Sequence, residues 1–547
     1  MGFVIEFKKL LKEGTRVKVN IINIRVKTII TNENIILVGF LSIRDRKENI
    51  DRDKLKLLIN EEEFDIKFPF KRIKVIRGLA ILSNFYIIKI PIEKLLTGNI
   101  HNKPFFIYKK DGEIVLKRSL RYNLFSNVNN YYTSRAKILK DKNTSVYVRQ
   151  SAKNRVMITV RNINKTDYPK EQIKINLAFL FSKIIPKNKI IMYEKNSSRY
   201  EESASVLYEK LIDLGYKNIY YIINKDNEKI KNINDKYKKH LVYKYSFRHY
   251  LYFFIAKTLI GTESPGHAIE LRTANRHSTK RIYSNKFNYV FLQHGVMYMV
   301  SLDSDGRSFF RKGGGMPRNA KIIVSSKEEE KHFIELGGDY EEKDFYVTGL
   351  PKFDKSIRYK NADKIVIMPT WRPWEFNLLR VDAKDAPYYK MLEEIIESIP
   401  KKYKNKIVLL PHPLVINNIK NTPLNKYIIK NKSYDEILRK TDILITDYSS
   451  IAYDAFYRGA NVIFWWKEKD FCMEQYNGHL MLNDNNAFGP VCYKKEELTQ
   501  NVNDLYKQKQ KEEYIKKYRK IVEFHDNKNT ERLVECLQKD KIIKKVK

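Results

Sequence analysis

The chain has 547 residues, a length that exceeds one ordinary hydrophobic core and predicts two or three domains. Its three cysteines, Cys472, Cys492 and Cys536, are widely spaced and form no CxxC pair. That usage argues against a disulfide framework or a structural zinc site and is typical of a reducing cytosol. Lys and Arg number 104 against 64 Asp and Glu, and the resulting net charge of +40 attracts nucleic acid, anionic lipid and polyphosphate substrates alike.

The first residues do not have the pattern of a signal peptide, because Glu6 and Lys8 stand where such a peptide needs its apolar stretch. No apolar run in the sequence approaches the roughly 20 residues that span a bilayer. We therefore expect neither secretion by that route nor an integral membrane protein.

Residues 1–165 alternate short runs of Val, Ile, Phe and Tyr with polar turns, as at residues 34–40 and 145–148. Short strands at a spacing of about ten residues predict a small β-sandwich or barrel.

From residue 166 the pattern changes to alternating strands and helices. The predicted elements are strands 190–193, 219–223 and 322–324 and helices 201–214 and 327–336. A βαβ series of this kind predicts a right-handed, parallel, doubly wound sheet, and a second series starts near Lys364.

The predicted fold class is therefore α/β, with two Rossmann-like domains after a β-rich accessory domain. We place the β-rich domain at residues 1–165, the first Rossmann-like domain at 166–360 and the second, which ends in a basic helical tail, at 361–547. The cleft between two such domains is the default place for a substrate.

Four short polar motifs each follow an apolar run directly. They are Gln293-His294-Gly295, Pro369-Thr370-Trp371-Arg372, Pro411-His412-Pro413 and Asp447-Tyr448-Ser449-Ser450. Ligands of open parallel sheets bind outside the carboxyl ends of the strands, so these residues are site candidates and the chain is interpreted as an enzyme.

Ser449 or Ser450 is predicted to be the N-cap of a helix over residues 451–458 that ends at Gly459. Hydroxyls and free backbone N–H groups at that point suit a phosphate. The alternative is that the serines only cap the helix.

His294 and His412 follow strands of different domains and are candidates for a general acid or base, with a purely structural role as the alternative. Gly295 would let the backbone approach a ligand, and Pro411 and Pro413 would fix the chain direction around His412.

Thr370 and Arg372 suit a pair of phosphate oxygens, whereas Trp371 is interpreted as a packing residue.

Two loops carry weaker signals. Residues 311–315 form a Gly-rich loop without the features of a P-loop, which we interpret as mobile, with contact to an acceptor phosphate as the alternative. Asp303 and Asp305 have the spacing of a metal-binding pattern, but their loop setting favours solvation. Residues 263–267 follow another apolar run and could line the same cleft.

At these residues the chain resembles the CDP-glycerol glycerophosphotransferase family, which includes teichoic acid primases and polymerases and related bacterial capsule polymerases. The resemblance covers about residues 190–497 and rests on five ordered motifs at residues 291–295, 347–354, 368–372, 410–413 and 442–450. Two residues depart from the family pattern. Gln293 stands where the teichoic acid polymerases usually have Trp before His-Gly, and those polymerases lack the proline that follows the second histidine here, Pro413. Residues 1–165 lie outside the match.

The resemblance implies a GT-B-like pair of Rossmann domains that takes glycerol phosphate or ribitol phosphate from CDP-glycerol or CDP-ribitol and releases CMP. The family's histidines fall on His294 and His412, and its nucleotide and phosphate contacts on residues 370–372 and 447–450. We expect His294 to accept the proton of the attacking hydroxyl, and His412, Arg372 and the two serines to hold the pyrophosphate, with no metal and no cofactor.

The expected acceptor is a lipid-linked polyol phosphate or saccharide, and the expected place is the cytoplasmic face of the cell membrane, to which the enzyme is attached peripherally. The basic segment 511–547 is the predicted contact with anionic lipid, through lysines and the apolar residues Ile515, Ile521, Val522, Leu533 and Leu537. The alternative is a solvated helix packed on the catalytic domain.

Two other functions are compatible with parts of the sequence. A GT-B glycosyltransferase that uses a nucleotide sugar would share the fold. A nucleic-acid-binding protein would use the charge, but the basic residues are spread along the chain and no recognisable nucleic-acid-binding module occurs, so we expect no nucleic acid partner.

Overall fold

The computed structural model describes residues 19–45, 51–71, 84–96, 100–122, 132–151, 154–284, 286–305, 307–313, 315–375, 378–379, 383–429 and 433–545. The chain divides into two compact units, Met1–Pro186 with Ile269–Lys286, and Lys187–Ala268 with Phe287–Lys547. The domain limits predicted from the sequence, residues 165 and 360, stay a prediction that limited proteolysis can test.

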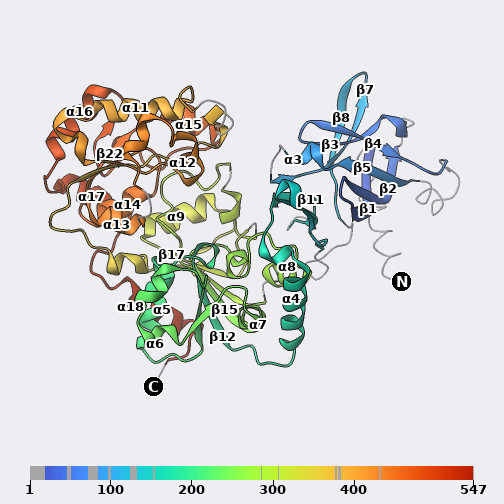
Figure 1. Cartoon of the computed structure of the whole chain (residues 1–547), viewed down its shortest axis with the longest axis horizontal. Helices are drawn as coiled ribbons and strands as arrows, with labels where there is room; N and C mark the ends of the chain where they lie inside the picture. The colour runs from blue at the N-terminus through green and yellow to red at the C-terminus, as the bar shows by residue number, and fades with distance from the viewer. Residues whose placement is uncertain are drawn as a thin grey trace. The chain divides into compact units, whose positions relative to one another are not determined.

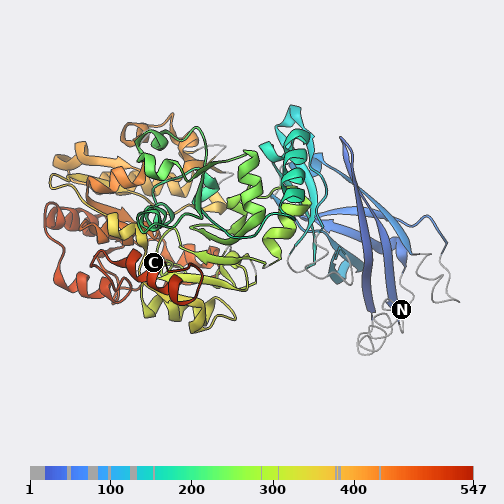
Figure 2. The same cartoon turned by 90° about the horizontal axis from the view of Figure 1, so that it is seen from below.

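The first unit contains two antiparallel sheets (Figure 1). The larger has the strand order β1 (Val19–Ile30), β2 (Asn34–Asp45), β5 (Phe85–Pro91), β4 (Glu62–Lys67), β3 (Leu55–Ile59), β7 (Phe105–Lys110) and β8 (Glu113–Ser119). The smaller has the order β6 (His101–Asn102), β11 (Val156–Asn162), β10 (Thr144–Gln150) and β9 (Lys137–Leu139). Figure 2 shows β1 and β2 as a long hairpin in the darkest blue.

Strand β3 alternates buried and half-buried residues, as a sheet does when one face covers a core. Leu57 and Ile88 of the larger sheet and Val146 and Ile158 of the smaller one belong to the same core, as in a β-sandwich. The predicted β-rich character of the N-terminal region is confirmed.

Helix α4 (Pro169–Phe181) follows the smaller sheet, and its first position is proline, whose fixed φ suits a helix start. Helix α8 (Arg276–Tyr283), from the connection between two strands of the second unit, lies beside α4. The rings of Phe179 and His277 stack with centroids 3.9 Å apart, and Asn275 Nδ2 donates to Gln172 Oε1 at 2.9 Å. Residues 269–286 are therefore part of the first unit.

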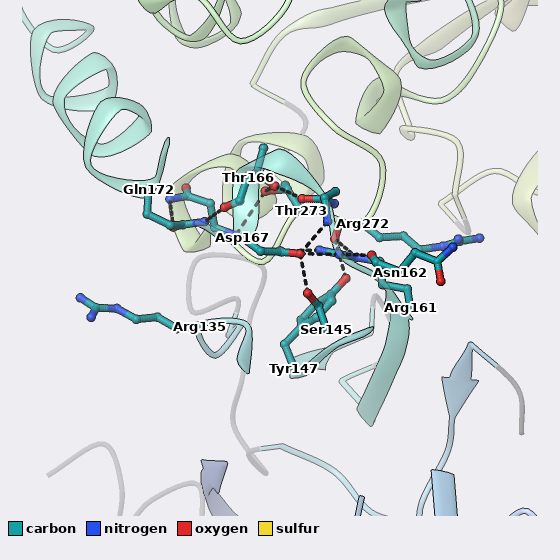
Figure 3. A network of polar contacts seen from close by, with 12 residues as sticks. Arg135, Ser145, Tyr147, Arg161, Asn162, Thr166, Asp167, Gln172, Arg272 and Thr273 are labelled. Carbon is teal, nitrogen blue, oxygen red and sulfur yellow. Dashed lines mark hydrogen bonds and ion pairs between the residues drawn. The ribbon is translucent and has the colours of Figure 1, made fainter. Parts of the chain in front are cut away.

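A polar network fixes the beginning of α4 on the smaller sheet (Figure 3). The Asp167 carboxylate accepts hydrogen bonds from Ser145 Oγ at 2.7 Å and from both terminal nitrogens of Arg161 at 2.7 Å. The carbonyl of Arg272 accepts a hydrogen bond from Tyr147 Oη at 2.8 Å. The bonds to the Asp167 carboxylate are charge-assisted and buried, and such bonds are stronger than those between neutral groups.

The second unit begins with a parallel sheet. Its strand order is β14 (Leu241–Tyr243), β13 (Ile219–Ile223), β12 (Lys189–Tyr193), β15 (Ala256–Gly261), β16 (Asn288–Phe291), β17 (Ala320–Val324) and β18 (Phe345–Val347). Its principal helices are α5 (Ser203–Asp213), α6 (Asp235–Lys238), α7 (Phe247–Ile255) and α9 (Lys327–Leu336). The strand residues are buried in continuous runs, because in such folds helices cover both faces of the sheet.

A second parallel sheet follows in the same unit. Its strand order is β20 (Ile407–Leu409), β19 (Lys364–Ile367), β21 (Thr441–Thr446), β22 (Asn461–Trp465) and β23 (Val491–Cys492). Its principal helices are α11 (Pro387–Ser398), α12 (Pro413–Ile419), α13 (Tyr434–Arg439), α14 (Ile451–Tyr457), α15 (Lys469–Gln475) and α16 (Lys495–Leu505). The predicted fold class, a GT-B-like pair of Rossmann-type domains after a β-rich region, is confirmed.

The C-terminal segment contains α17 (Glu512–Arg519) and α18 (Asn529–Lys539), and α18 returns to pack against α5 of the first Rossmann-type domain (Figure 1). The Asp354 carboxylate accepts hydrogen bonds from the backbone N–H groups of Asn529 at 3.0 Å and Thr530 at 2.7 Å, and so caps α18.

The prediction that the apolar residues of segment 511–547 contact lipid is wrong. Ile521, Val522, Leu533 and Leu537 are buried in the core, and Ile515 packs against it, so the alternative of a packed helix is correct. The apolar residues that suggested lipid contact are instead buried where the chain packs back on the core. Among the described residues, no helix is long and apolar enough to cross a membrane.

Candidate active site

Each parallel sheet has a point where the strand order reverses, and in open α/β sheets ligands bind beside that point at the carboxyl ends of the strands. The order reverses between β12 and β15 in the first sheet and between β19 and β21 in the second. Lys195 and Glu263 follow β12 and β15, whereas Thr370 and Ser449 follow β19 and β21. Two of the four polar motifs, those of Thr370 and Ser449, therefore flank a switch point. His294 and His412 follow the strands next to the switch points, β16 and β20.

A cavity of about 370 Å³ opens between the two Rossmann-type domains, within the second unit. The first domain contributes His294 together with Lys195, Glu263 and Lys352, and the second contributes Ser449, Ser450 and Asp454. Further cations and acids line it, among them Arg199, Glu202, Lys355, Arg439 and Arg458. Two of the four predicted motifs, those of His294 and of the serines, thus meet at one cavity.

His294 is the third residue after the end of β16, and its side chain is 43 % exposed and lines the cavity. Its Nδ1 lies 3.9 Å from Glu263 Oε1. The protein atoms around the ring desolvate it and lower the pKa of His294, and the Glu263 carboxylate opposes that shift. A neutral imidazole beside a carboxylate is the arrangement of an oriented general base.

His267 lies on the other side of Glu263, with its Nε2 3.9 Å from Glu263 Oε2. His267 is itself held, because its Nδ1 accepts a hydrogen bond from Asn196 N–H at 3.0 Å and its carbonyl accepts one from Ser197 Oγ at 2.7 Å. Glu263 thus lies between two histidines, of which only His294 lines the cavity.

Lys352 connects the two domains at the cavity wall. Its Nζ forms an ion pair with Asp454 Oδ1 at 2.6 Å and donates to the carbonyl of His294 at 2.9 Å. The side chains of Lys352 and Asp454 are only 11 % and 7 % exposed, so the pair is little screened by solvent. Lys352 fixes the backbone of His294 relative to the second domain.

Gly295 lies directly against Ser450, and a Cβ at Gly295 would come within 2.9 Å of Ser450 Oγ. Ser450 is the N-cap of α14 but its side chain makes no capping bond, and Ser449 Oγ accepts from Ile451 N–H only at 3.4 Å. Both serines line the cavity, and neither is fully used by the helix.

Thr370 and Asp447 tie the ends of β19 and β21 together below the serines. Asp447 Oδ1 accepts hydrogen bonds from the N–H and the Oγ1 of Thr370, both at 2.7 Å, while Tyr448 is buried. Burial raises the pKa of Asp447, and Arg372 opposes the shift. Neither Thr370 nor Asp447 lines the cavity, so their geometry is that of supports for the serine turn.

Arg372 lies in an environment that the sequence did not indicate. Its guanidinium is buried and forms ion pairs with Glu375 at 3.2 Å and Glu468 at 2.9 Å, and it does not line the cavity. Two carboxylates thus occupy the position expected for a phosphate.

His412 is half-buried, stacks on Trp371 with ring centroids 5.0 Å apart, and does not line the cavity. Burial and the charge of Lys195 lower the pKa of His412, so its ring lies within electrostatic reach of a cavity residue. Pro413 is the first residue of α12.

The electrostatic character of the cavity suits a diphosphate. Burial and the neighbouring Glu194 raise the pKa of Glu202 to about 8, whereas the charges of Lys352 and Arg199 oppose that shift. Arg199 also forms an ion pair with Glu202 at 3.3 Å, and Lys195 and Lys352 are further cations of the cavity wall.

Sequence reasoning missed Lys195, Lys352 and Asp454. Lys195 follows a predicted strand, 190–193, and the rule that identified the other motifs would have found it there. Lys352 stands inside the motif at residues 347–354, which was given no role of its own.

The two loops with weaker signals are not part of the cavity lining. Neither Asp303 nor Asp305 lines it, nor do the described residues of the Gly-rich loop. In the described part of the chain, no group of three His, Cys, Asp or Glu side chains is arranged to hold a metal ion. The absence of a metal from the mechanism stays a prediction.

Comparisons with known proteins found relatives of this chain. The model of the family described as CDP-Glycerol:Poly(glycerophosphate) glycerophosphotransferase matches residues 177–539. The chain is 27 % identical over 346 residues to the minor teichoic acid biosynthesis protein GgaB of Bacillus subtilis, covering 58 % of this chain and 36 % of that protein. It is 25 % identical over 231 residues to the teichoic acid poly(glycerol phosphate) polymerase of Bacillus spizizenii, covering 40 % and 56 %.

The chain thus spans about a third to a half of these curated relatives. Among solved structures, the wall teichoic acid polymerase TagF aligns with a TM-score of 0.47 and 18 % identity, covering 68 % of this chain and 93 % of that one.

Proposed function

The chain belongs to the CDP-glycerol:poly(glycerophosphate) glycerophosphotransferase family, and on that premise we propose that it transfers a polyol phosphate from a CDP-activated donor to an acceptor hydroxyl and releases CMP. The observation that carries the proposal is the cavity at the two switch points, where an oriented histidine faces two serines among cations. Glycerol phosphate is the first candidate for the transferred group, and ribitol phosphate is the second.

In the proposed reaction the acceptor oxygen attacks the donor phosphorus that bears the polyol. A new P–O bond forms, the P–O bond to the bridging oxygen breaks, and CMP leaves with that oxygen. His294 accepts the proton of the attacking hydroxyl, and Glu263 orients the imidazole. The protein contributes chiefly position and charge, as is general for phosphoryl transfer.

The donor lies against the second domain in this proposal, with its pyrophosphate beside Ser449 and Ser450 and within reach of Lys195. Lysine ammonium groups and serine hydroxyls stabilise the negative charge that develops on the departing CMP. Gly295 allows the phosphates to approach the backbone, and Tyr448 belongs to the same turn.

Thr370, Asp447 and Arg372 are proposed to hold that turn in place. Arg372 would have to leave both Glu375 and Glu468 before it could contact a phosphate. We therefore assign it a positioning role. Trp371, which stacks on His412, and Pro413, the next residue in the chain, are proposed to belong to the substrate site. His412 is proposed to act from beside Lys195 on the leaving group.

The acceptor is proposed to be lipid-linked, and the enzyme to work peripherally at the cytoplasmic face of the cell membrane. The net charge of +40 supports attraction to an anionic leaflet. Lipid-linked acceptors lie at that leaflet, so attachment would bring the enzyme and its acceptor together.

A donor panel tests the proposal. CMP release is measured with CDP-glycerol and CDP-ribitol, and nucleotide release is measured with UDP- and GDP-sugars in parallel. Acceptor-dependent release of CMP from a CDP-polyol is the expected result. Turnover of a nucleotide sugar in place of CDP-polyols would instead identify a glycosyltransferase.

A further inference from the structure

Helix α4 exposes a continuous apolar stripe to solvent. Ile173 is 61 % exposed, Leu177 45 %, Leu180 54 % and Ile184 79 %. Ile173, Leu177 and Leu180 are four and three residues apart and so share one face of α4, on which Phe181 is also 48 % exposed. Ile184 follows three residues after the helix ends. Single exposed apolar residues are normal, but a contiguous stripe of this kind marks a contact surface.

The opposite face of α4 already has its own partner. Glu171, Ile175 and Ala178 are buried, α8 lies beside the helix, and the Asp167 network holds its start (Figure 3). Apolar residues therefore lie on both faces of the helix, and one of these faces is packed in the protein. A partner outside the described residues would be needed to bury the other face.

The charges around the stripe are positive. Between residues 165 and 189 the acids are Asp167 and Glu171, and both are buried and ion-paired. The same segment contains six lysines, of which four are exposed, namely Lys165, Lys170, Lys183 and Lys187.

Helix α8 adds further cations at the C-terminal end of α4. Burial and the charges of Arg276, Lys183 and Lys280 lower the pKa of His277, whose ring stacks on Phe179. Lys183 Nζ also lies 5.2 Å from the centroid of that phenylalanine ring. Cations from two helices thus gather at one end of the stripe.

We propose that the exposed face of α4, with its flanking lysines, docks on the surface of an anionic membrane. Apolar side chains would enter the acyl boundary while the lysines contact lipid phosphates, as in interfacial helices. A second copy of this chain fits less well, because a symmetric contact through this face would bring the same cations together. The inference rests on the peripheral attachment proposed above and assigns it to α4 instead of segment 511–547.

Vesicle co-sedimentation of the full-length protein tests this inference. The wild type should bind phosphatidylglycerol vesicles and not phosphatidylcholine vesicles. Leu177→Glu with Leu180→Glu should weaken binding at least about tenfold, because charge is placed into the apolar contact. Lys183→Gln with Lys187→Gln should weaken vesicle binding by a smaller factor than the glutamate substitutions. That loss should be larger at low salt than at high salt.

The matched control is Leu214→Glu with Phe247→Glu, two residues of the second unit that are each 40 % exposed. It should bind vesicles like the wild type. Equal binding by the α4 variant, or equal loss by the control, would overturn the assignment. A concentration-dependent dimer that the α4 variant dissociates would overturn it in favour of a second copy.

The α4 variant separates this inference from the proposed function. With a water-soluble acceptor it should release CMP within about twofold of the wild-type rate, because α4 lies outside the cavity. Vesicle binding through α4 without any CMP release would leave the docking surface standing and remove the proposed transfer. CMP release together with vesicle binding that does not depend on α4 would support the proposed transfer and remove the docking surface.

Discussion

At the scale of single residues, the central arrangement is a histidine between a carboxylate and a lysine. Glu263 faces the imidazole of His294, whereas Lys352 holds its carbonyl and reaches Asp454 in the other domain. The side chain that would take the proton is thereby oriented by one contact and its backbone by another. A displacement of about 1 Å at such a group can cost on the order of a hundredfold in rate.

Glu263→Gln should change the pH profile of kcat/KM as well as its height. The wild-type carboxylate raises the pKa of His294 against the effect of burial, so its removal lets that pKa fall further. Because the base acts in its neutral form, the acid limb of the profile should move to lower pH. The maximum should fall about tenfold as the ring loses its orientation. Glu335→Gln, at an exposed site on α9, is the control, and an unmoved or raised acid limb would exclude Glu263 from this role.

His412→Phe distinguishes chemistry from packing at the second histidine. Phenylalanine can keep the stacking on Trp371 but removes both ring nitrogens. If His412 acts on the leaving group, CMP release should slow at least about tenfold while the thermal midpoint stays within a few degrees. Retention of the wild-type rate would make His412 a packing residue.

At the scale of elements, strand ends and one returning helix build the site. The strands β12, β15 and β16 deliver Lys195, Glu263 and His294, and α18 crosses back to the first domain. Asp354 holds that helix, and it stands two residues after Lys352 in the same turn. Loss of the cap should therefore affect both stability and the cavity wall.

Asp354→Ala should lower the free energy of unfolding by about 1–3 kcal/mol, because the carboxylate accepts charge-assisted bonds from the first turn of α18. Chemical denaturation of the full-length protein measures the effect. Asp226→Ala, an exposed carboxylate after β13, should change it by less than about 0.5 kcal/mol. Equal stability of the two variants would mean that the cap contributes nothing.

At the scale of the whole molecule, the sequence predicted what depends on local pattern. The buried runs at residues 190–193, 219–223 and 322–324 form strands, and helix 327–336 has the predicted ends. Strand-end placement also indicated His294, Ser449 and Ser450, which line the cavity.

Long-range packing was not predictable in the same way. The lysine-rich tail and the helix at residues 169–181 both carry apolar residues among lysines, and only the fold decides which apolar face is buried. The tail covers the core, and α4 leaves its stripe exposed. Arg372 likewise pairs with two carboxylates, Glu375 and Glu468, to which no sequence pattern pointed.

The role of His294 as the base is measured by acceptor-dependent, single-turnover release of CMP from CDP-glycerol, compared between the wild type and His294→Ala. His240→Ala is the control, since that ring contacts the carbonyl of Ile219 at the opposite end of the sheet. We expect a rate at least about a hundredfold lower for His294→Ala and an unchanged rate for the control. A His294→Ala enzyme that keeps more than about a tenth of the wild-type rate would contradict it.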